Sequence, residues 1–405
     1  MPPRRLRSAL LAGAAALAVA ATGTALALSA SGTSNAAVLP NGFKSVGYMP
    51  SWSGSATAIQ YSKLTHINYS FALPNANGTL QPIENTAKLQ QIVQLGHQNN
   101  VKVLLAVGGW NDGNDSAFET LAASASGRST FVSSMVNVVN QYNLDGVDID
   151  WEYPDPGASG DNYTLLMRDL SAAMKSRGKL LTAAVVSEGG TANGVQPAVF
   201  GYVDFLNIMT YDGGTPHANY DWAINAVNFW KGRGLPKEKA ILGVPFYSRP
   251  GWQTFASLVA RDPANANRDC VVINGVNECY NGLPTIRRKT QWAMANAGGI
   301  MNWELSQDAT GQYSAVSAIY EVATGGQPPV TTAPTTRPPT TSPTTRPPTT
   351  PPTTQPPSGT AWAPYTAYSV GQVVTYGGRR YQARQAHTSL PGWEPPNVLA
   401  LWLPL

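Results

Sequence analysis

The segment Leu144–Tyr153 constrains the fold most, because its acidic residues alternate strictly with apolar ones. Successive side chains of a strand point to opposite faces, so Asp148, Asp150 and Glu152 share one face and the apolar side chains share the other. Burial penalises charge and like charges repel, which makes a buried row of three carboxyl groups costly. Such perturbed clusters concentrate at active sites, so the row predicts catalysis. A solvated acidic face and a divalent-cation site are the alternatives.

Short apolar runs alternate with helix-like spacing between Lys44 and Thr324, which predicts an α/β fold. The expected strands are Ser45–Met49, Thr65–Ala72, Lys102–Val107, Gly146–Trp151, Leu180–Val186, Phe205–Thr210, Ala240–Phe246 and Gly299–Trp303. The expected helices are Asn85–Asn99, Gly127–Asn143, Asp161–Arg177, Tyr220–Gly232, Thr285–Ala297 and Gln312–Ala323. Eight strands alternating with helices fit a (β/α)8 TIM barrel. An open doubly wound sheet is the alternative, but Met49–Trp52 offers no glycine-rich nucleotide turn after the first strand.

Polar and aromatic residues gather at the carboxyl ends of the expected strands, where a barrel of this kind carries its active site. They are Tyr48, Phe71, Trp110, Glu152, Met209, Tyr211, Asp212, Tyr247 and Trp303. Several aromatic rings at one rim predict a stacking surface for sugars, because pyranose C–H faces are apolar while their edges form hydrogen bonds.

The charge content restricts the partners. Asp, Glu, Lys and Arg make up 12% of the chain, about half of the ~25% usual in globular domains. A surface finished with neutral polar residues suits a neutral, hydroxyl-rich ligand. No basic run resembles a nucleic-acid-binding surface, and the four histidines, at 66, 97, 217 and 387, lack metal-site spacing. We therefore expect no metal, no cofactor and no nucleic-acid partner. A long tethered module at the C-terminal end makes a monomer the default expectation.

Residues 1–36 have the order of a secretory signal. Three arginines precede an Ala/Leu-rich core at Ala9–Leu28, and small residues follow before Ala37. A transmembrane anchor is the alternative, but alanine dominates the core and Gly and Thr interrupt it, so we expect a secreted, extracellular protein with no membrane partner. In an exported chain Cys270 and Cys279 predict one local disulfide, with two free thiols as the alternative.

The composition breaks after Gly325. Residues 326–360 are dominated by Pro and Thr, which predicts an extended, semi-rigid linker. Aromatic patterning resumes over 361–405, where Val370–Ala383 reads as a β-hairpin and predicts a small all-β module. Trp393 lies in a turn-like segment, which favours an exposed sugar-binding platform over a packed loop anchor.

Four motifs resemble those of family 18 glycoside hydrolases, the chitinases. Asp145–Glu152 resembles the DxxDxDxE signature, Met209–Asp212 the strand-six motif and Leu104–Trp110 the strand-three motif, and Trp303 stands at the position of the strand-eight tryptophan. The resemblance covers essentially all of residues 44–324, within an expected catalytic domain of 41–325. Residues 361–405, with Gln385–Pro396, look like the small chitin-binding module common on bacterial chitinases.

The resemblance implies a retaining, substrate-assisted hydrolysis of chitin. Glu152 would be the general acid, and the substrate's own N-acetyl carbonyl would attack the anomeric carbon to give an oxazolinium ion. Asp150 would bind the acetamido N–H and share a proton with Asp148, and Tyr211 and Asp212 would orient the acetamide. Trp303 would form the floor under the sugar; the further expected substrate contacts are Trp110, Tyr48, Met209, Phe71, Tyr247 and Trp393.

One position departs from the family pattern: the strand-three serine that holds the first Asp of the row is Ala106 here. A water or Tyr48 could supply the missing contact to Asp148. The path from Tyr247 to Gly299 leaves little room for an inserted domain, which predicts an open groove and endo-type cleavage. The alternatives are an endo-β-N-acetylglucosaminidase acting on glycoprotein glycans, a non-hydrolytic chitin-binding lectin and a structural wall protein.

Overall fold

The computed structural model describes residues 39–214, 216–326, 360–363, 366–389, 394–396 and 401–405. The expected signal segment, almost all of the linker and Trp393 lie outside these ranges. The chain divides into two compact units, Met1–Thr331 and Thr332–Leu405, which are described separately below. Across the described ranges, no helix combines the length and the apolar character that a bilayer crossing requires.

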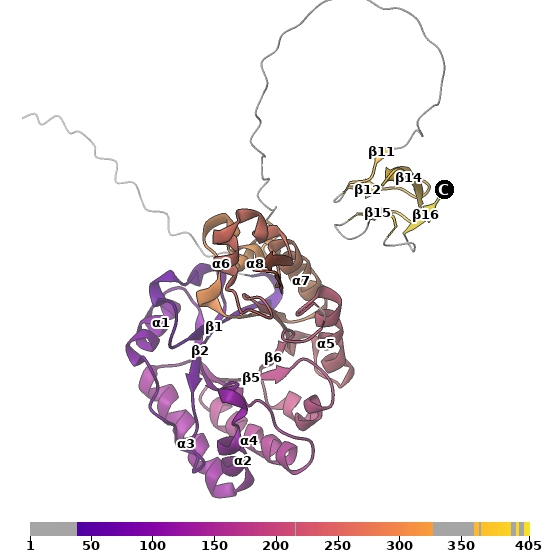
Figure 1. The fold of residues 1–405 in the computed structure, drawn as a ribbon. Helices are drawn as coiled ribbons and strands as arrows, with labels where there is room; N and C mark the ends of the chain where they lie inside the picture. Colours follow the sequence, from indigo (N-terminus) through magenta and orange to yellow (C-terminus); the bar gives the residue numbers. More distant parts are fainter. Residues whose placement is uncertain (1–38, 215, 327–359, 364–365, 390–393, 397–400) are drawn as a thin grey trace, which may run out of the picture. The chain divides into compact units, whose positions relative to one another are not determined.

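Eight parallel strands of the described residues close into a barrel (Figure 1). The strands are β1 (Lys44–Pro50), β2 (His66–Ala72), β3 (Lys102–Gly108), β4 (Gly146–Asp150), β5 (Leu180–Val186), β6 (Phe205–Met209), β7 (Ala240–Pro245) and β10 (Gly299–Trp303). β1 pairs with both β2 and β10, so the sheet has no free edge. The predicted (β/α)8 barrel is confirmed, and the open doubly wound sheet is excluded.

Helices surround these strands (Figure 1). They are α1 (Thr86–Gln98), α2 (Ser116–Ala123), α3 (Ala125–Tyr142), α4 (Ala158–Lys175), α5 (Tyr220–Gly232), α6 (Phe255–Arg261), α7 (Leu283–Asn296) and α8 (Ala315–Ala323). The six predicted helices are confirmed, whereas α2, α6 and the hairpin of β8 (Cys270–Ile273) and β9 (Val276–Cys279) were not predicted. The predicted start of the last helix at Gln312 is wrong, because Ser314 caps α8 by accepting from the backbone N–H of Ser317.

Single 3-10 turns lie in the connections. They are η1 (Pro40–Gly42), η2 (Ala56–Ala58), η3 (Tyr61–Lys63), η4 (Asn111–Gly113), η5 (Thr191–Gly194), η6 (Pro197–Gly201), η7 (Lys237–Lys239), η8 (Pro263–Asn267), η9 (Leu305–Gln307) and η10 (Gly311–Tyr313).

The apolar face of β4 anchors the strand against the helices. Val147, Ile149 and Trp151 are all buried there, as the alternation predicted. The Trp151 ring stacks on Phe118 of α2 at 5.1 Å between centroids, and its Nε1 donates to Asp115 at 2.9 Å. With one face packed in this way, the carboxyl groups of the opposite face point into the barrel.

The second unit is all-β in its described residues, and its core is aromatic. Its strands are β11 (Thr360–Ala361), β12 (Ala367–Tyr368), β13 (Val373–Tyr376), β14 (Arg379–Ala383), β15 (His387–Thr388) and β16 (Trp402–Pro404). β13 and β14 form the predicted hairpin, and Gly377 and Gly378 both have the positive φ that a tight two-residue turn requires. Tyr368, Tyr381 and Trp402 are buried in its core.

Candidate active site

The acidic row of Asp148, Asp150 and Glu152 runs from the barrel interior to its mouth. Asp148 and Asp150, on β4, have exposed fractions of 0% and 3%. Glu152 lies two residues beyond the end of β4 and is only partly buried. The predicted order of depth along the row is therefore confirmed, and Glu152 is the only one of the three that is not buried.

Three side chains from other strands hold Asp148. The hydroxyl of Tyr48 donates to Oδ2 at 2.6 Å, and Thr182 Oγ1 and Asn207 Nδ2 donate to Oδ1 at 2.5 and 3.1 Å. Ala106 lies directly opposite Asp148 in the β3–β4 register, so the missing serine is replaced by Tyr48 together with two donors that sequence reasoning missed. A polar residue inside an otherwise apolar run was the available signal for both Thr182 and Asn207.

Burial keeps protons on this row. It raises the pKa of Asp148 to about 6, although hydrogen bonds from Thr182, Tyr48 and Asn207 work in the opposite direction. Burial, followed by the charges of Glu152 and Asp148, raises the pKa of Asp150 well above its ordinary value. Within the described residues, Oδ1 of Asp150 is buried and has no hydrogen-bond partner. Asp150 is therefore the member of the row that most favours the neutral form.

The pKa of Glu152 is also raised, to about 6, by burial and by the charge of Asp212, against a hydrogen bond with Tyr153. A carboxyl group with this pKa is still partly protonated near neutrality. Because it faces the opening, Glu152 can donate a proton to a bound molecule and take it back, which is the behaviour of a general acid and base.

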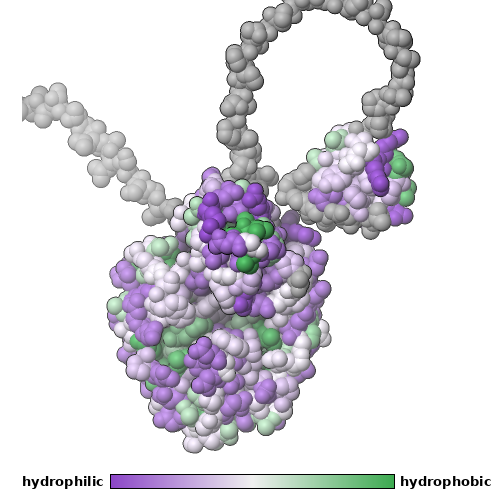
Figure 2. All heavy atoms as spheres, in the orientation of Figure 1, coloured by the Kyte–Doolittle hydropathy of each residue, from purple (hydrophilic) through white to green (hydrophobic). Residues whose placement is uncertain are grey.

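A groove of about 840 Å³ opens above Glu152 and Asp150. Figure 2 shows this hollow in the face of the barrel, with apolar residues inside it. Its aromatic lining is Tyr48, Trp52, Phe71, Trp110, Tyr153, Tyr211, Tyr247, Trp252 and Trp303. Met209 and Asp212 also line it, so the structure brings together every candidate from the barrel except Asp148, which lies beneath.

Trp303 forms an ordered floor. Phe71 stacks against it with centroids 5.4 Å apart, and Tyr48 meets it edge-on at 5.7 Å. Tyr48 itself is 2% exposed and donates to Asp148, so it holds both the row and the floor while also lining the groove.

Three exposed tryptophans stand around the groove. Trp52, Trp110 and Trp252 have exposed fractions of 63%, 60% and 54%. Sequence reasoning named Trp110 and missed Trp52 and Trp252, which follow the ends of β1 and β7. Their position after strand ends was the signal that could have found them.

Asp212 is bound to Arg249 on the neighbouring wall of the groove. Arg249 Nε donates to its Oδ1 at 2.7 Å, and the guanidinium lies 3.4 Å from the centre of the Trp252 ring. Burial would raise the pKa of Asp212, but hydrogen bonds with His217, Arg249 and Tyr247 and the charge of Arg249 lower it to about 2. Asp212 is therefore a charged member of a salt bridge.

Tyr211 lines the groove, and its hydroxyl is only weakly engaged. Burial raises its pKa well above the ordinary value, so the group stays protonated. Within the described part of the chain its hydroxyl has one weak contact, to Met301 Sδ at 3.9 Å.

The same described residues contain no group of three or more His, Cys, Asp or Glu that could hold a metal ion.

Cys270 and Cys279 form the predicted disulfide, which closes the β8–β9 hairpin. The alternative of two free thiols is excluded. The hairpin stands beside the wall that carries Arg249, since Arg249 and Cys279 are joined by an antiparallel bridge.

Comparisons with known proteins match both units. A family model described as glycosyl hydrolases family 18 matches residues 44–308, and one described as carbohydrate-binding module family 5/12 matches residues 361–403. The chain is 32% identical over 302 residues to Chitinase A1 of Niallia circulans, covering 52% of this chain and 43% of that protein. Chitotriosidase-1 of Mus musculus and a probable endochitinase of Caenorhabditis elegans are covered over 53% and 41% of their length, so the chain spans about half, or less, of these three relatives.

Solved structures share the barrel. The GH18 chitinase ChiB of Flavobacterium johnsoniae aligns with a TM-score of 0.61 and 30% identity, covering 69% of this chain and 94% of that one. A chitinase-like agglutinin of Robinia pseudoacacia aligns with a TM-score of 0.62 and 24% identity, covering 69% of this chain and 99% of that one, which is a likeness of fold alone.

Proposed function

Because the chain belongs to the glycosyl hydrolases of family 18, we propose that it is a secreted chitinase that cleaves the β-1,4 bonds between N-acetylglucosamine units of chitin. One observation carries this proposal: the partly protonated Glu152 stands at the mouth of an aromatic groove, directly above two buried carboxyl groups. A lectin needs the aromatic groove, but it has no use for this costly stack of acids.

The first chemical step breaks the glycosidic bond. Glu152 donates its proton to the glycosidic oxygen, which leaves with the bonding electron pair. The carbonyl oxygen of the substrate's own acetamide forms the new bond to the anomeric carbon, giving an oxazolinium ion. No second carboxylate of the row reaches the groove mouth to act as nucleophile, since Asp150 and Asp148 lie deeper.

The second step adds water. Glu152, now ionised, accepts a proton from the water as its oxygen bonds to the anomeric carbon, and the acetamide is released with overall retention. Asp150 accepts the acetamido N–H and, when ionised, offsets the positive charge of the ring. A proton moving from Asp150 to Asp148 allows this, because burial raises the pKa of Asp148 to about 6 even though its three donors favour the ionised form.

The remaining site residues orient the sugar. The weakly engaged hydroxyl of Tyr211 donates a hydrogen bond to the acetamide carbonyl, while Asp212 acts through its salt bridge with Arg249 at the same wall. Trp303 carries the apolar face of the reacting sugar, and the exposed rings of Trp52, Trp110 and Trp252 stack neighbouring sugars.

An endo-type cleavage fits the open groove. Between β7 and β10 the chain forms only α6, η8, the β8–β9 hairpin and α7, so no inserted domain stands over the groove. Exposed tryptophans line the groove beside the row, which favours a site where a long chain passes through. The second unit would hold the enzyme on insoluble chitin through its matched carbohydrate-binding module. We also propose that residues 1–36 direct export of the protein and that the protein is a monomer.

The experiment that tests it measures reducing ends released from colloidal chitin by the full chain, with the Glu152→Gln variant as control. Steady release by the parent and none by the variant is the expected result. Binding without release would indicate a lectin, and release from a glycoprotein glycan but not from chitin would indicate an endo-β-N-acetylglucosaminidase.

A further inference from the structure

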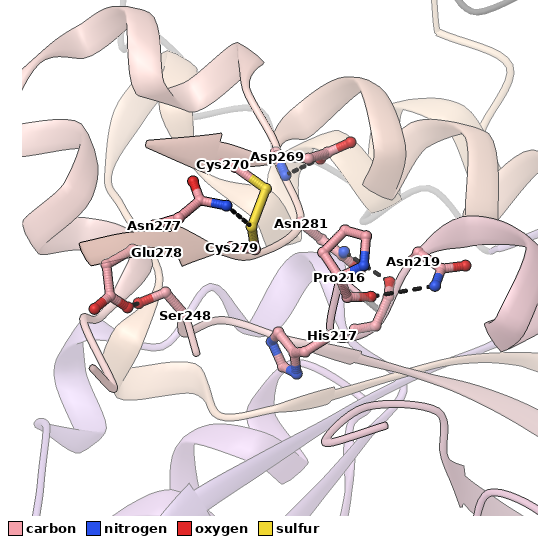
Figure 3. The surroundings of a disulfide bond; sticks show 12 residues. Pro216, His217, Asn219, Ser248, Asp269, Cys270, Asn277, Glu278, Cys279 and Asn281 are labelled. Carbon is pink, nitrogen blue, oxygen red and sulfur yellow. Dashed lines mark hydrogen bonds between the residues drawn. A yellow bond between two sulfur atoms is a disulfide. The ribbon is translucent and has the colours of Figure 1, made fainter. Parts of the chain in front are cut away.

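A short segment beside the groove contacts two of its walls at once. The segment is Glu278–Asn281, which ends the β8–β9 hairpin, and we call it the support segment. The disulfide between Cys270 and Cys279 ties it to the start of the hairpin (Figure 3). No site residue of the proposed mechanism belongs to it.

The first wall is joined through the backbone. Arg249 N–H donates to the carbonyl of Cys279 at 2.9 Å, and Cys279 N–H donates to the carbonyl of Arg249 at 2.9 Å. The residue that carries the disulfide is therefore paired directly with the residue that binds Asp212.

Glu278 holds the turn that follows. Its side chain is 4% exposed, and its Oε2 accepts from Ser248 Oγ at 2.7 Å and from Gly251 N–H at 2.9 Å. Figure 3 shows Glu278 pointing at Ser248. The carboxylate lies so close that a Cβ on Gly251 would come within 2.1 Å of Oε1. The next residue, Trp252, has a φ of +55°, so the turn needs outside support to hold that ring at the groove.

The second wall is joined at the other end of the segment. Asn281 Nδ2 donates to the carbonyl of Ala218 at 2.9 Å, and the buried Nζ of Lys289 donates to the same carbonyl at 2.8 Å and to Asn281 Oδ1 at 2.7 Å. Ala218 has a φ of +56° and closes the loop that begins at Asp212. Figure 3 shows Asn281 on the side of Pro216 and His217, away from Glu278.

The two walls meet in the groove. Asp212, from the loop of the second wall, and Arg249, from the turn of the first wall, form their salt bridge at 2.7 Å, and Arg249 lies against Trp252. The relative position of these groups depends on two loops that the support segment fixes together.

We propose that the disulfide-closed support segment is a positioning element for substrate binding, and that Glu278 is the residue through which it sets the place of Arg249 and Trp252. Glu278 touches no substrate and acts through the turn. This inference rests on the proposed function, because it assigns the segment to the binding of the same chitin chain.

The test compares Glu278→Ala, Glu278→Gln and the control Val272→Ala on soluble chito-oligosaccharides. Val272 is 67% exposed on the same hairpin and lies outside the support segment. We expect Glu278→Ala to raise KM about tenfold with kcat changed less than about threefold, since the lost interactions position bound substrate in ground and transition states alike. Glu278→Gln keeps one acceptor oxygen and should recover most of the affinity, and the control should match the parent.

Binding is measured separately in the Glu152→Gln background, where calorimetry with the same oligosaccharides should show a matching loss of affinity for the Glu278→Ala double variant. Thermal unfolding of each variant separates a local effect from loss of the fold. Unchanged KM and affinity in a folded Glu278→Ala variant would overturn the inference.

The disulfide is tested independently of Glu278. Dithiothreitol treatment of the full chain should raise KM, and so should the Cys270→Ser/Cys279→Ser substitution. An unaltered KM in the reduced protein would contradict the role of the disulfide. If the parent itself releases no reducing ends from chitin, the proposed function fails. If the parent is active and Glu278→Ala equals it, only the positioning role fails.

Discussion

The hydroxyl of Tyr48 on β1 donates a 2.6 Å hydrogen bond to Oδ2 of Asp148 on β4, across the barrel interior. The two strands are not neighbours, because β2 and β3 lie between them on one side. Asn207 on β6 donates to both the Tyr48 oxygen and Asp148 Oδ1, each at 3.1 Å. The buried end of the acidic row is thus fixed from three directions, which keeps the proton acceptor beneath Asp150 in a single position.

Replacing Tyr48 by Phe should lower kcat about tenfold with little change in KM, because it removes a donor to a buried carboxyl group that never touches the substrate. Steady-state kinetics on soluble chito-oligosaccharides measures this. Tyr61→Phe is the matched control, since the Tyr61 hydroxyl is also buried but donates to the carbonyl of Ala56. A Tyr48→Phe enzyme with parental kcat would show that Asp148 needs no such anchor.

Glu152→Gln should remove nearly all hydrolysis and leave oligosaccharide binding largely intact, because the amide has the shape of the acid but no acidic proton to donate. Turnover should fall by a factor of about 10² to 10⁴, the range typical of a lost general acid. Product analysis and calorimetry on the same preparation give both readouts. An active variant would place the acid elsewhere.

The pH profile should have a falling alkaline limb. The folded-state pKa of Glu152 is raised to about 6, and the reaction needs its protonated form, so kcat/KM should decline as the pH rises above about 6. Asp212, with a pKa lowered to about 2, adds no limb in the same range. Initial rates across buffers of equal ionic strength test this, and a profile that stays flat to about pH 9 is incompatible with Glu152 as the acid.

Asp308→Ala should reduce the free energy of unfolding by about 2–4 kcal/mol, because it leaves buried donors without partners. Asp308 accepts from Ser314 Oγ at 2.7 Å and from the backbone N–H of Ala315 and Val316 at 2.7 and 3.1 Å, at the start of α8. Asp221→Ala, an exposed change in the first turn of α5, is the control and should cost less than about 0.5 kcal/mol. Urea unfolding followed by circular dichroism compares the two.

Trp393→Ala should weaken retention on insoluble chitin without altering turnover of soluble oligomers, since the sequence predicts a sugar platform at that residue. Tyr376→Ala changes a ring that is 37% exposed on β13 and should retain parental adsorption. Depletion of each variant from solution by chitin beads measures the difference. Equal retention of the Trp393 variant would remove this residue from the platform.

The alternation of residues in Leu144–Tyr153 was sufficient to predict the acidic row, because a period of two has only one structural meaning in a strand. The barrel followed from the spacing of the apolar runs. Helix α2 was missed because Ser116–Ala123 is too short to show a clear amphipathic period. The β8–β9 hairpin was missed although Asn274–Gly275 is a strong turn signal, and both residues have positive φ.

Contacts between distant strands were beyond sequence reasoning. Thr182 and Asn207 reach Asp148 only because the barrel closes and brings β5 and β6 around to it. The salt bridge of Asp212 with Arg249 depends on the left-handed backbone at Asp212, whose φ is +60°. The sequence pattern around these residues predicts neither the contacts to Asp148 nor the salt bridge of Asp212.

The acidic row belongs to one five-residue strand and the two positions after it, whereas the tryptophans around the groove belong to the chain after β1, β3 and β7. Proton transfer and polymer recognition are thus encoded in separable pieces of the chain. Grafting a different loop onto any of those strand ends would change the preferred polysaccharide and leave the acid in place. Substrate preference can therefore change on this scaffold while the catalytic residues stay the same.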